Sequence, residues 1–540
     1  MNNTSPPPLP RLQDLPGELG LARPLDCRRF LIDGELRQWR GPMQEVRAPF
    51  FIQGADGPEQ PLVGHCPAHD ATTGMQALDA AVAAWDGGLG VWPCLPPHER
   101  AACVAEFARR MAEKQTEIVR LMQLEICKSK AECEQEFLRT IDYFKDTIDA
   151  HEAMLRASSG LVETERMLAQ VRRSPLGVVL CMGPFNFPLN ETMATLIPAL
   201  LMGNTAVVKL PRIGRLLFFP LMDCLHAAFP RGVVNMICGE TEAVAQVMAS
   251  GKIDVLAFIG TSRAAEAMRA MHPRPVRLRC VFGLEAKNAA IILNDADVDL
   301  AVKQVMRGAF GFNGQRCTAL KLVFAQAGIA PEFTRRLAEA ADTLAVGMPW
   351  EPGVAITPLP EPGKAQFLDD LLRDALVRGA RVETNRSGAR DASLFEPTVL
   401  SGVTAEMRVF HEEQFGPLCP VVTFTDTDEV LRAIAASDYG QQASVFGADL
   451  NVLGRLTDRL ANLVSRVNIG CKAQRGPDVL PFTARKDSAV GTLSVNEALS
   501  AFSIETLVAA NMTSEGARQM RRLREGGLSV YLTPERNGQD

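Results

Sequence analysis

The feature that most constrains the fold is an alternation, from about residue 170 onward, of short β-branched runs with longer stretches of helical spacing. This order is typical of βαβ units and predicts an α/β fold with a largely parallel sheet. A second alternation over about 288–465 predicts another α/β domain, as expected for a chain of 540 residues. The predicted strands of the first block are 177–181, 205–209, 232–238 and 253–259, and its predicted helices are 215–229, 242–250 and 262–271.

The regions outside these alternations have other patterns. Residues 75–155 carry apolar side chains at helical spacing and are predicted to be mainly helical. The proline-rich segment 1–29 is predicted to be flexible, and the charged residues 513–540 are predicted to form a loosely attached tail. The polar, alternating stretch 164–173 is predicted to be a strand.

Charge and hydropathy exclude several classes of protein. The net charge of −6 gives no basic footprint for nucleic acid or an anionic membrane. The apolar runs are broken by Gly and Pro before they reach the ~20 residues that a membrane span needs. The start lacks the basic and apolar regions of a secretory signal, so we expect a cytoplasmic protein. Thirteen cysteines, an odd number without paired spacing, favour reduced thiols over a disulfide framework.

The segment GHCPAHD contains the most obvious metal-like cluster, His65, Cys66 and His69. No second pair of ligands follows at zinc-finger spacing, and the sequence has no C-x-x-C. We therefore predict no metal and interpret the segment as the end of a strand that leads into a helix.

The segment FIGTS places Gly260, Thr261 and Ser262 between a predicted strand and a predicted helix. The G-x-G-x-x-G fingerprint is absent from the chain's strand-to-helix turns. The free amides at a helix start nevertheless suit a phosphate, so these residues are candidates for cofactor binding. The alternative is that Gly260 makes a tight turn and Ser262 only caps the helix.

Two residues have surroundings that suit carbonyl chemistry. Cys317 lies in GFNGQRCTALK, where Arg316 supplies a cation and Gly314 an open backbone, as a reactive thiolate requires. Asn186 lies in GPFNFP, where the prolines hold its amide rigidly at the end of a predicted strand. A fixed amide is a suitable donor for an oxyanion, although an asparagine there can also be a satisfied turn residue.

Together these segments resemble the aldehyde dehydrogenase superfamily, in collinear order from about residue 75 to 510. The motifs are PFNFP, GNTAVVKLP, FIGTS, a Glu-containing stretch before KNAAIILNDADVD, NGQRCTA, EEQFGPLCPV and PFTARKDS. The resemblance implies that Cys317 is the nucleophile and that Asn186 stabilises the oxyanion. It also implies that Lys209 holds the cofactor ribose and phosphate, that Glu413 binds the nicotinamide ribose, and that Phe415 belongs to the same cofactor site.

Within the superfamily, GQRCTALK and QRGPD look like the non-phosphorylating, NADP-dependent glyceraldehyde-3-phosphate dehydrogenases. That resemblance assigns the substrate phosphate to Arg139, Arg316 and Arg475, and arginine forks suit phosphate oxygens. Each arginine can instead be an ordinary surface or helix-end charge. Phe187 stands where this branch commonly has a tyrosine, so one hydroxyl near the substrate is missing.

Arg212 bears on the choice of cofactor. An arginine close to the adenosine ribose can pair with a 2′-phosphate, and no acidic residue closely follows Lys209 to bind a free 2′-hydroxyl. The sequence therefore favours NADP, while an Arg212 that points to solvent leaves NAD possible.

The general base is the main departure from the family pattern E-L-G-G-K. Aligned on Lys287, this chain reads GLEAK, so Gly283 takes the usual glutamate position and Glu285 lies two residues later. Residues two apart in an extended segment share a face, so Glu285 is the candidate base for hydrolysis of the thioester. Glu285 can also be a structural carboxylate, in which case deacylation is reduced or absent.

The resemblance implies a Rossmann-like cofactor domain over 30–155 and 172–281 and a catalytic domain over 282–482. A small oligomerisation hairpin over 156–171 and 497–512 implies a homodimer or homotetramer. The predicted function is NADP-dependent, irreversible oxidation of an aldehyde to an acid, with glyceraldehyde 3-phosphate as substrate. The alternatives are a dehydrogenase for a non-phosphorylated aldehyde or semialdehyde, and a weakly active nucleotide-binding homologue.

Overall fold

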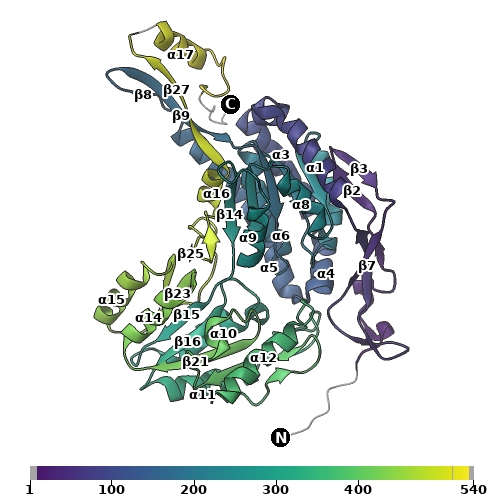
Figure 1. Cartoon of the computed structure of the whole chain (residues 1–540), viewed down its shortest axis with the longest axis vertical. Helices are drawn as coiled ribbons and strands as arrows, with labels where there is room; N and C mark the ends of the chain where they lie inside the picture. The colour runs from purple at the N-terminus through teal and green to yellow at the C-terminus, as the bar shows by residue number, and fades with distance from the viewer. Residues whose placement is uncertain (1–8, 514, 534–540) are drawn as a thin grey trace.

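A computed structural model describes residues 9–513 and 515–533 and contains two parallel sheets (Figure 1). The first sheet has the order β12, β11, β10, β13, β14, β26, and only β26 runs antiparallel. Its strands are β10 (Val178–Met182), β11 (Thr205–Lys209), β12 (Val234–Ile237), β13 (Val255–Ile259), β14 (Arg279–Gly283) and β26 (Ala489–Val490). The chain reverses its direction of winding at β10, and ligands of such sheets bind beyond the carboxyl ends at this point.

The first sheet is buried on both faces, which is why its strands are continuous apolar runs. Along β10, Val178 and Leu180 pack on one side with the helices α1 (Ala71–Trp85) and α8 (Glu242–Ala249). Val179 and Cys181 pack on the other side with the helix α6 (Pro188–Leu201). The helices of this half are α1 (Ala71–Trp85), α3 (Pro97–Ala112), α4 (Gln115–Ile126), α5 (Lys130–Ala157), α6 (Pro188–Leu201), α7 (Phe219–Ala228), α8 (Glu242–Ala249) and α9 (Ser262–Ala270). The predicted strands and helices of the first block are confirmed to within a few residues.

The second sheet has the order β17, β20, β21, β16, β15, β23, β24, and β15 is its central strand. Its strands are β15 (Asn288–Ile292), β16 (Leu320–Gln326), β17 (Arg381–Val382), β20 (Thr398–Ser401), β21 (Leu418–Phe424), β23 (Gln442–Phe446) and β24 (Arg466–Ile469). Alternate residues of β15 face two separate apolar cores, Ala290 and Ile292 on one side and Ala289 and Ile291 on the other. The chain is therefore an α/β protein with two doubly covered sheets, as the sequence predicted.

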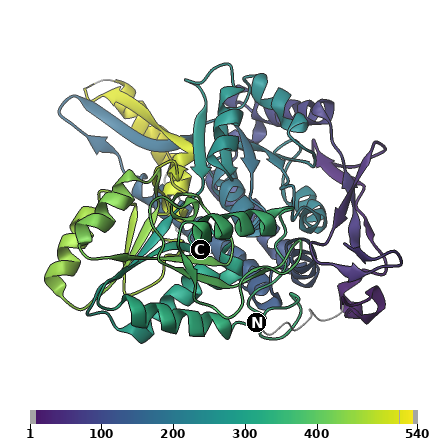
Figure 2. The same cartoon turned by 60° about the horizontal axis from the view of Figure 1, so that its bottom comes forward.

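A third sheet extends away from both (Figures 1 and 2). It consists of β8 (Val162–Glu163), β9 (Met167–Pro175) and β27 (Ser503–Asn511), and β9 pairs with β27 antiparallel along their full lengths. Val171 and Leu507, which are paired across the two strands, are both exposed. A role in oligomerisation for this hairpin, and the domain boundaries given above, stay predictions.

The C-terminal segment is not the loosely attached tail that the sequence suggested. Helix α17 (Glu515–Glu525) packs on the hairpin, and Leu168, Ala517, Met520 and Leu532 form a small buried core. The prediction was wrong for residues 515–533 because it rested on their charged composition and overlooked the few apolar residues that pack on the hairpin. Residues 534–540 lie outside the described residues.

The N-terminal segment is also ordered where it is described. Leu19 and Leu21 are buried, and β1 (Leu25–Asp26) pairs in parallel with β7 (Leu62–Pro67). The prediction of a flexible segment was therefore wrong for residues 9–29, and residues 1–8 lie outside the described residues. Within residues 9–513 and 515–533, no helix is long and apolar enough to cross a membrane.

Candidate active site

Cys317 lies between the short helix η5 (Gly311–Gly314) and β16, in a loop with unusual backbone geometry. Phe312 and Asn313 have positive φ values of 46° and 55°, which are uncommon for residues other than glycine. The Asn313 amide is fixed by two hydrogen bonds with Thr357, one from the Thr357 amide (2.9 Å) and one to its hydroxyl (3.1 Å). The rest of the chain therefore holds the loop in a conformation that its sequence alone does not favour.

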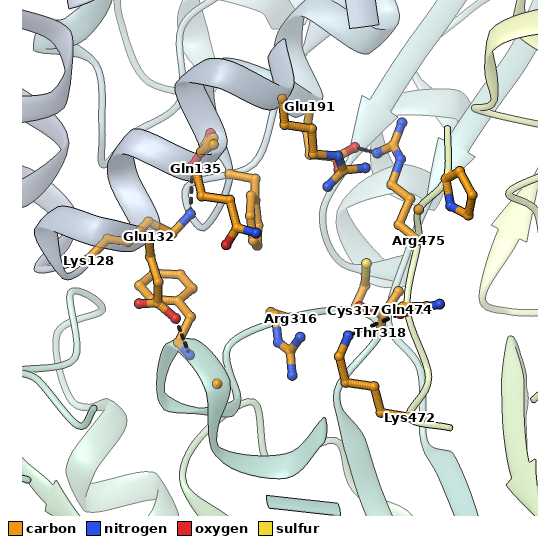
Figure 3. A pocket seen from close by; sticks show the side chains of 17 residues that line it. Lys128, Glu132, Gln135, Glu191, Arg316, Cys317, Thr318, Lys472, Gln474 and Arg475 are labelled. Atoms are coloured by element: carbon orange, nitrogen blue, oxygen red, sulfur yellow. Dashed lines mark hydrogen bonds and ion pairs between the residues drawn. The ribbon is translucent and has the colours of Figure 1, made fainter. Parts of the chain in front are cut away.

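Cys317 opens onto a cavity of about 470 Å³ (Figure 3). Four sequence predictions are brought together there, since Phe187, Arg139, Arg316 and Arg475 all line the same cavity. The sequence analysis did not single out the seven further lining residues with charged or amide side chains, which are Lys128, Glu132, Gln135, Glu136, Glu191, Lys472 and Gln474. Lys472 and Gln474 could have been predicted from the sequence, because they lie just before Arg475 in KAQRGPD.

Two of the three predicted arginines already have carboxylate partners. Arg139 binds Asp478 through Nε (2.9 Å) and Nη2 (2.7 Å). Arg475 is buried, pairs with Glu191 and lies 3.3 Å from Asp478. Burial lowers the pKa of Arg475 to about 10. A substrate anion must therefore compete with Asp478 and Glu191 for these two side chains.

Arg316 and Lys472 differ from the other cations of the lining. Arg316 donates from Nη2 to the carbonyls of Arg307 (2.7 Å) and Gly308 (2.8 Å). Lys472 has only a long contact, 3.4 Å, with the amide oxygen of Gln474. Burial, and then the charge of Arg316, lower the pKa of Lys472 to about 8. In the part of the chain that the structure describes, neither cation forms an ion pair, so both remain available to an anion.

The Asn186 side chain lies directly against the nucleophile loop. Its Nδ2 donates to the carbonyl of Gln315 at 2.8 Å, two residues before Cys317. A primary amide has two N–H donors, so one remains for a second acceptor. The geometry is compatible with the predicted oxyanion donor.

A buried ion pair supports both Asn186 and the loop. Lys128 Nζ lies 2.5 Å from Glu136, donates to the carbonyl of Asn186 at 2.9 Å, and lies over the rings of Phe187 (3.4 Å) and Phe312 (4.4 Å). Both charged side chains are at most 1% exposed. The second oxygen of Glu136 accepts the amides of residues 189 and 190 at the start of α6, where a negative charge is favourable.

The Cys317 thiol is not activated in the way the sequence suggested. Burial raises its pKa above the ordinary value, and the opposing effects of Lys321 and Arg316 are smaller. The expectation that the neighbouring Arg316 would supply enough positive charge for a thiolate is therefore corrected. The direction of this shift favours the protonated thiol over the thiolate.

The predicted cofactor residue Glu413 is connected to the nucleophile. Its carboxylate accepts from Lys321 Nζ (2.5 Å) and from the amide of Ala286 (3.0 Å), and Lys321 also donates to the carbonyl of Cys317 (3.0 Å). Phe415, with φ of 45°, packs its ring 5.9 Å from that of Phe185 in the PFNFP turn. Glu413 and Phe415 are thus adjacent to the same loop and turn that carry Cys317 and Asn186.

Glu285 does not line the cavity of Cys317. Its carboxylate accepts from the amide (3.0 Å) and the hydroxyl (2.8 Å) of Ser262, at the start of α9. Thr261 caps the same helix by accepting from the amide of Ala264, and Gly260 precedes it. The start of α9 therefore binds an anionic group in this structure, and that group is the side chain of Glu285.

Lys209, the last residue of β11, and Arg212, three residues later, supply positive charge at the carboxyl end of this strand. Lys209 is buried, and burial followed by the charge of Arg215 lowers its pKa. Arg212 is exposed, and its carbonyl accepts from Arg215 Nε at 2.8 Å. Two cations and an anion-binding helix start at one end of the sheet suit a ligand with several phosphates.

Comparison with known proteins decides the family. The aldehyde dehydrogenase family matches residues 57–508. This chain belongs to the aldehyde dehydrogenase family. It is therefore an enzyme of the NAD(P)-dependent aldehyde dehydrogenase family. The resemblance seen in the sequence is confirmed.

Several aldehyde dehydrogenases are similar over most of their length. The NADP-dependent glyceraldehyde-3-phosphate dehydrogenase of Streptococcus equinus is 30% identical over 483 residues, which cover 88% of this chain and 96% of the relative. Lactaldehyde dehydrogenase of Escherichia coli (strain K12) is 30% identical over 430 residues, 78% of this chain and 86% of the relative. The structure of the NADP-dependent glyceraldehyde-3-phosphate dehydrogenase from Bacillus halodurans C-125, complexed with NADP, superimposes with a TM-score of 0.81 at 31% identity and covers 90% of this chain and 99% of its own.

The two functions named for these relatives differ in the charge of the substrate. Membership of the aldehyde dehydrogenase family therefore establishes the reaction class, while the aldehyde is a separate question. Among the described residues of this aldehyde dehydrogenase, no group of three or more His, Cys, Asp or Glu side chains is arranged to hold a metal ion.

The ion pair of Lys128 and Glu136 gives a stability prediction. Replacing Lys128 by Met leaves a buried carboxylate without its cation, and we expect the free energy of unfolding to fall by about 3–5 kcal/mol. The measurement is urea denaturation followed by circular dichroism. The exposed pair of Lys252 and Asp79 provides the control, since Lys252→Met should change stability by less than about 1 kcal/mol. Equal effects of the two substitutions would contradict a supporting role for the buried pair.

The raised pKa of Cys317 gives a reactivity prediction. Because the thiolate is the reactive form, alkylation of Cys317 by iodoacetamide in the cofactor-free protein should accelerate as pH rises from 7 through 9. Mass spectrometry of the peptide that carries Cys317 measures the rate at each pH. Lys321→Met should slow the reaction further, because the lysine opposes the rise in pKa. A rate that does not change over this range would mean that the thiolate is already formed at pH 7.

Proposed function

We propose that this chain catalyses the NADP-dependent, irreversible oxidation of glyceraldehyde 3-phosphate to 3-phosphoglycerate through a thioester on Cys317. The observation that carries the proposal is the location of the nucleophile. Cys317 shares one cavity with Arg316 and Lys472, two cations without carboxylate partners among the described residues. An aldehyde that carries an anionic group can bind these cations while its carbonyl faces the thiol.

Each chemical step has a proposed residue. The Cys317 thiolate adds to the aldehyde carbon, and the remaining N–H of Asn186 donates to the oxyanion that forms. Bound NADP supplies the hydride acceptor. Lys209, Arg212, Gly260, Thr261, Ser262, Glu413 and Phe415 are proposed to hold the cofactor, and the exposed Arg212 supports a 2′-phosphate over a free hydroxyl.

Deacylation is the step for which this chain departs from its family. Glu285 is the proposed general base, but its carboxylate is bonded to Ser262 at 2.8 Å and 3.0 Å. Both hydrogen bonds go to Oε2, so within the described residues Oε1 remains free, but Glu285 does not line the cavity of Cys317 and has to move toward it before it activates a water for the thioester. This movement of Glu285 is thus expected to limit the rate at which the thioester is hydrolysed.

A second candidate function is the oxidation of a non-phosphorylated aldehyde or a semialdehyde. The pairing of Arg139 and Arg475 with Asp478 and Glu191 favours it, since two of the proposed phosphate ligands are already neutralised. The carboxylate of a semialdehyde substrate carries one negative charge, so Lys472 and Arg316 suffice to bind it. A third candidate, a weakly active nucleotide-binding homologue, is favoured only by the engagement of Glu285 with Ser262.

Steady-state reduction of NADP and, separately, NAD tests the proposal. We expect a higher kcat/KM for D-glyceraldehyde 3-phosphate, without inorganic phosphate, than for lactaldehyde or succinic semialdehyde. Cys317→Ser should lower kcat by about a thousandfold or more because the nucleophile is lost. A higher kcat/KM for an unphosphorylated aldehyde would favour the second candidate. A single burst of NADPH without turnover would show acylation without deacylation, and no reduction with any aldehyde would favour the third candidate.

Lys472 gives a prediction about charge selectivity. Lys472→Met should raise KM for glyceraldehyde 3-phosphate by about 10–100-fold, as expected for the loss of a charged hydrogen bond, and leave KM for an uncharged aldehyde nearly unchanged. In the wild type, kcat/KM for the anionic substrate should fall as pH rises through about 8, because the lysine loses its proton. The exposed Lys303→Met is the control. Equal changes in KM for charged and uncharged aldehydes would contradict this role.

A further inference from the structure

The Cys66 side chain of the segment GHCPAHD faces another cysteine. Cys66 in β7 and Cys238, directly after β12, have their sulfur atoms 3.6 Å apart, and both are at most 2% exposed. All thirteen cysteines lie in the part of the chain that the structure describes, and all are free thiols. Among them, Cys66 and Cys238 are the two whose sulfur atoms form a hydrogen bond with each other. The segments that carry them are fixed to one another by the amide of His69, which donates to the carbonyl of Cys238 at 2.8 Å.

The guanidinium of Arg215 contacts both sulfur atoms. Arg215 Nη1 lies 3.8 Å from the sulfur of Cys66 and 4.0 Å from that of Cys238. The hydrogen bond between the two sulfur atoms and the charge of Arg215 both lower the pKa of Cys238, although burial opposes them. Cys238 is therefore more acidic than an ordinary cysteine, and a second thiol is in contact with it.

Arg215 also connects this pair to the proposed cofactor site. It donates from Nε to the carbonyl of Arg212 at 2.8 Å and forms an ion pair with Glu240 at 3.6 Å. The charges of Arg215 and Cys238 both act on the pKa of Lys209, the first lowering it and the second raising it. A change in the charge or position of the two sulfur atoms therefore alters the position of the Arg212 backbone and the pKa of Lys209.

We propose that Cys66 and Cys238 form a disulfide when a hydroperoxide reaches them, and that this cross-link weakens cofactor binding at Lys209 and Arg212. The sulfur atoms need to approach by roughly 1.5 Å to reach the length of a disulfide bond. In the cross-linked state Cys238 no longer has a thiolate form next to Arg215. Glu240 then remains as the acidic partner of Arg215 and Lys209, so the repulsion between these two cations is compensated less, and the backbone that Arg215 holds at Arg212 shifts with it.

The chemistry uses a peroxide as the two-electron oxidant. The Cys238 thiolate attacks one peroxide oxygen, the O–O bond breaks, and a sulfenic acid forms as hydroxide takes up a proton and leaves as water. The Cys66 sulfur then attacks the sulfenic sulfur, the S–O bond breaks, and the Cys66 proton leaves with the second water. Two thiols and one hydrogen peroxide thus give one disulfide and two waters, and a dithiol reverses the cross-link.

The two halves of the proposal rest on different grounds. Cross-linking rests only on the sulfur positions and on Arg215, and it holds whatever the substrate is. The effect on affinity rests on the proposed cofactor site. We therefore expect that the two can be tested separately in the full-length protein.

The first experiment is peptide mapping of the wild type after treatment with hydrogen peroxide. We expect the peptides that carry Cys66 and Cys238 to be joined by a bond that dithiothreitol cleaves. Cys66→Ser and Cys238→Ser should each abolish the joined peptide, while Cys419→Ser, a buried cysteine in β21, should not. Recovery of both cysteines as free thiols under conditions that oxidise Cys317 would overturn the cross-link, and this result needs no variant to fold.

The second experiment is calorimetric titration of NADP into Cys317→Ser protein, first reduced and then oxidised by peroxide. We expect Kd to rise about fivefold or more on oxidation and to recover with dithiothreitol, a typical size for coupling between sites. A cross-link without a change in Kd would overturn the regulatory half. Failure of the reduced protein to bind NADP would overturn the cofactor site and the regulatory half together, while a joined peptide would still support the disulfide.

Discussion

The ion pair between Lys128 and Glu136 is the interaction on which the active-site geometry depends. Transferring both charges out of water is costly, and the pair persists because further partners compensate each charge. The ammonium contacts the Asn186 carbonyl and two aromatic rings, and the carboxylate accepts two amides at the start of α6. One buried contact thereby fixes the turn that carries Asn186, the start of α6 and the loop that precedes Cys317 relative to one another.

The departure from the pattern E-L-G-G-K lies at the end of β14 and in the linker to β15. Gly283 has no side chain to offer, and the carboxylate that follows two residues later faces α9. The next amide in the linker, that of Ala286, contacts Glu413 instead. The linker therefore contacts both the start of α9 and Glu413, and Lys321 joins Glu413 to the carbonyl of Cys317.

Much of the fold was predictable because each local pattern had one interpretation. The run 205–209 is apolar and β-branched on both faces, so its burial between two helix layers followed directly, and β11 has these same bounds. Cys317 and Asn186 stood out in the sequence because turn residues surround them, and their catalytic roles stay predictions. The partners of Arg139 and Arg475 were not, because Asp478 and Glu191 lie 339 and 284 residues away and the sequence carries no signal for such pairs. The chain ends were mispredicted since a few apolar residues, such as Leu19 and Met520, suffice to attach them.

The carboxylates that face Arg139 and Arg475 change how the cavity selects its substrates. Since these arginines are not free, an entering anion gains contact with them only by exchanging places with Asp478 or Glu191. A singly charged group that takes the place of a carboxylate replaces one negative charge with another, whereas a doubly charged group brings one charge more and must also displace the carboxylate. The two carboxylates therefore make binding at Arg139 and Arg475 a competition between anions, in which the charge of the ligand counts more than its shape.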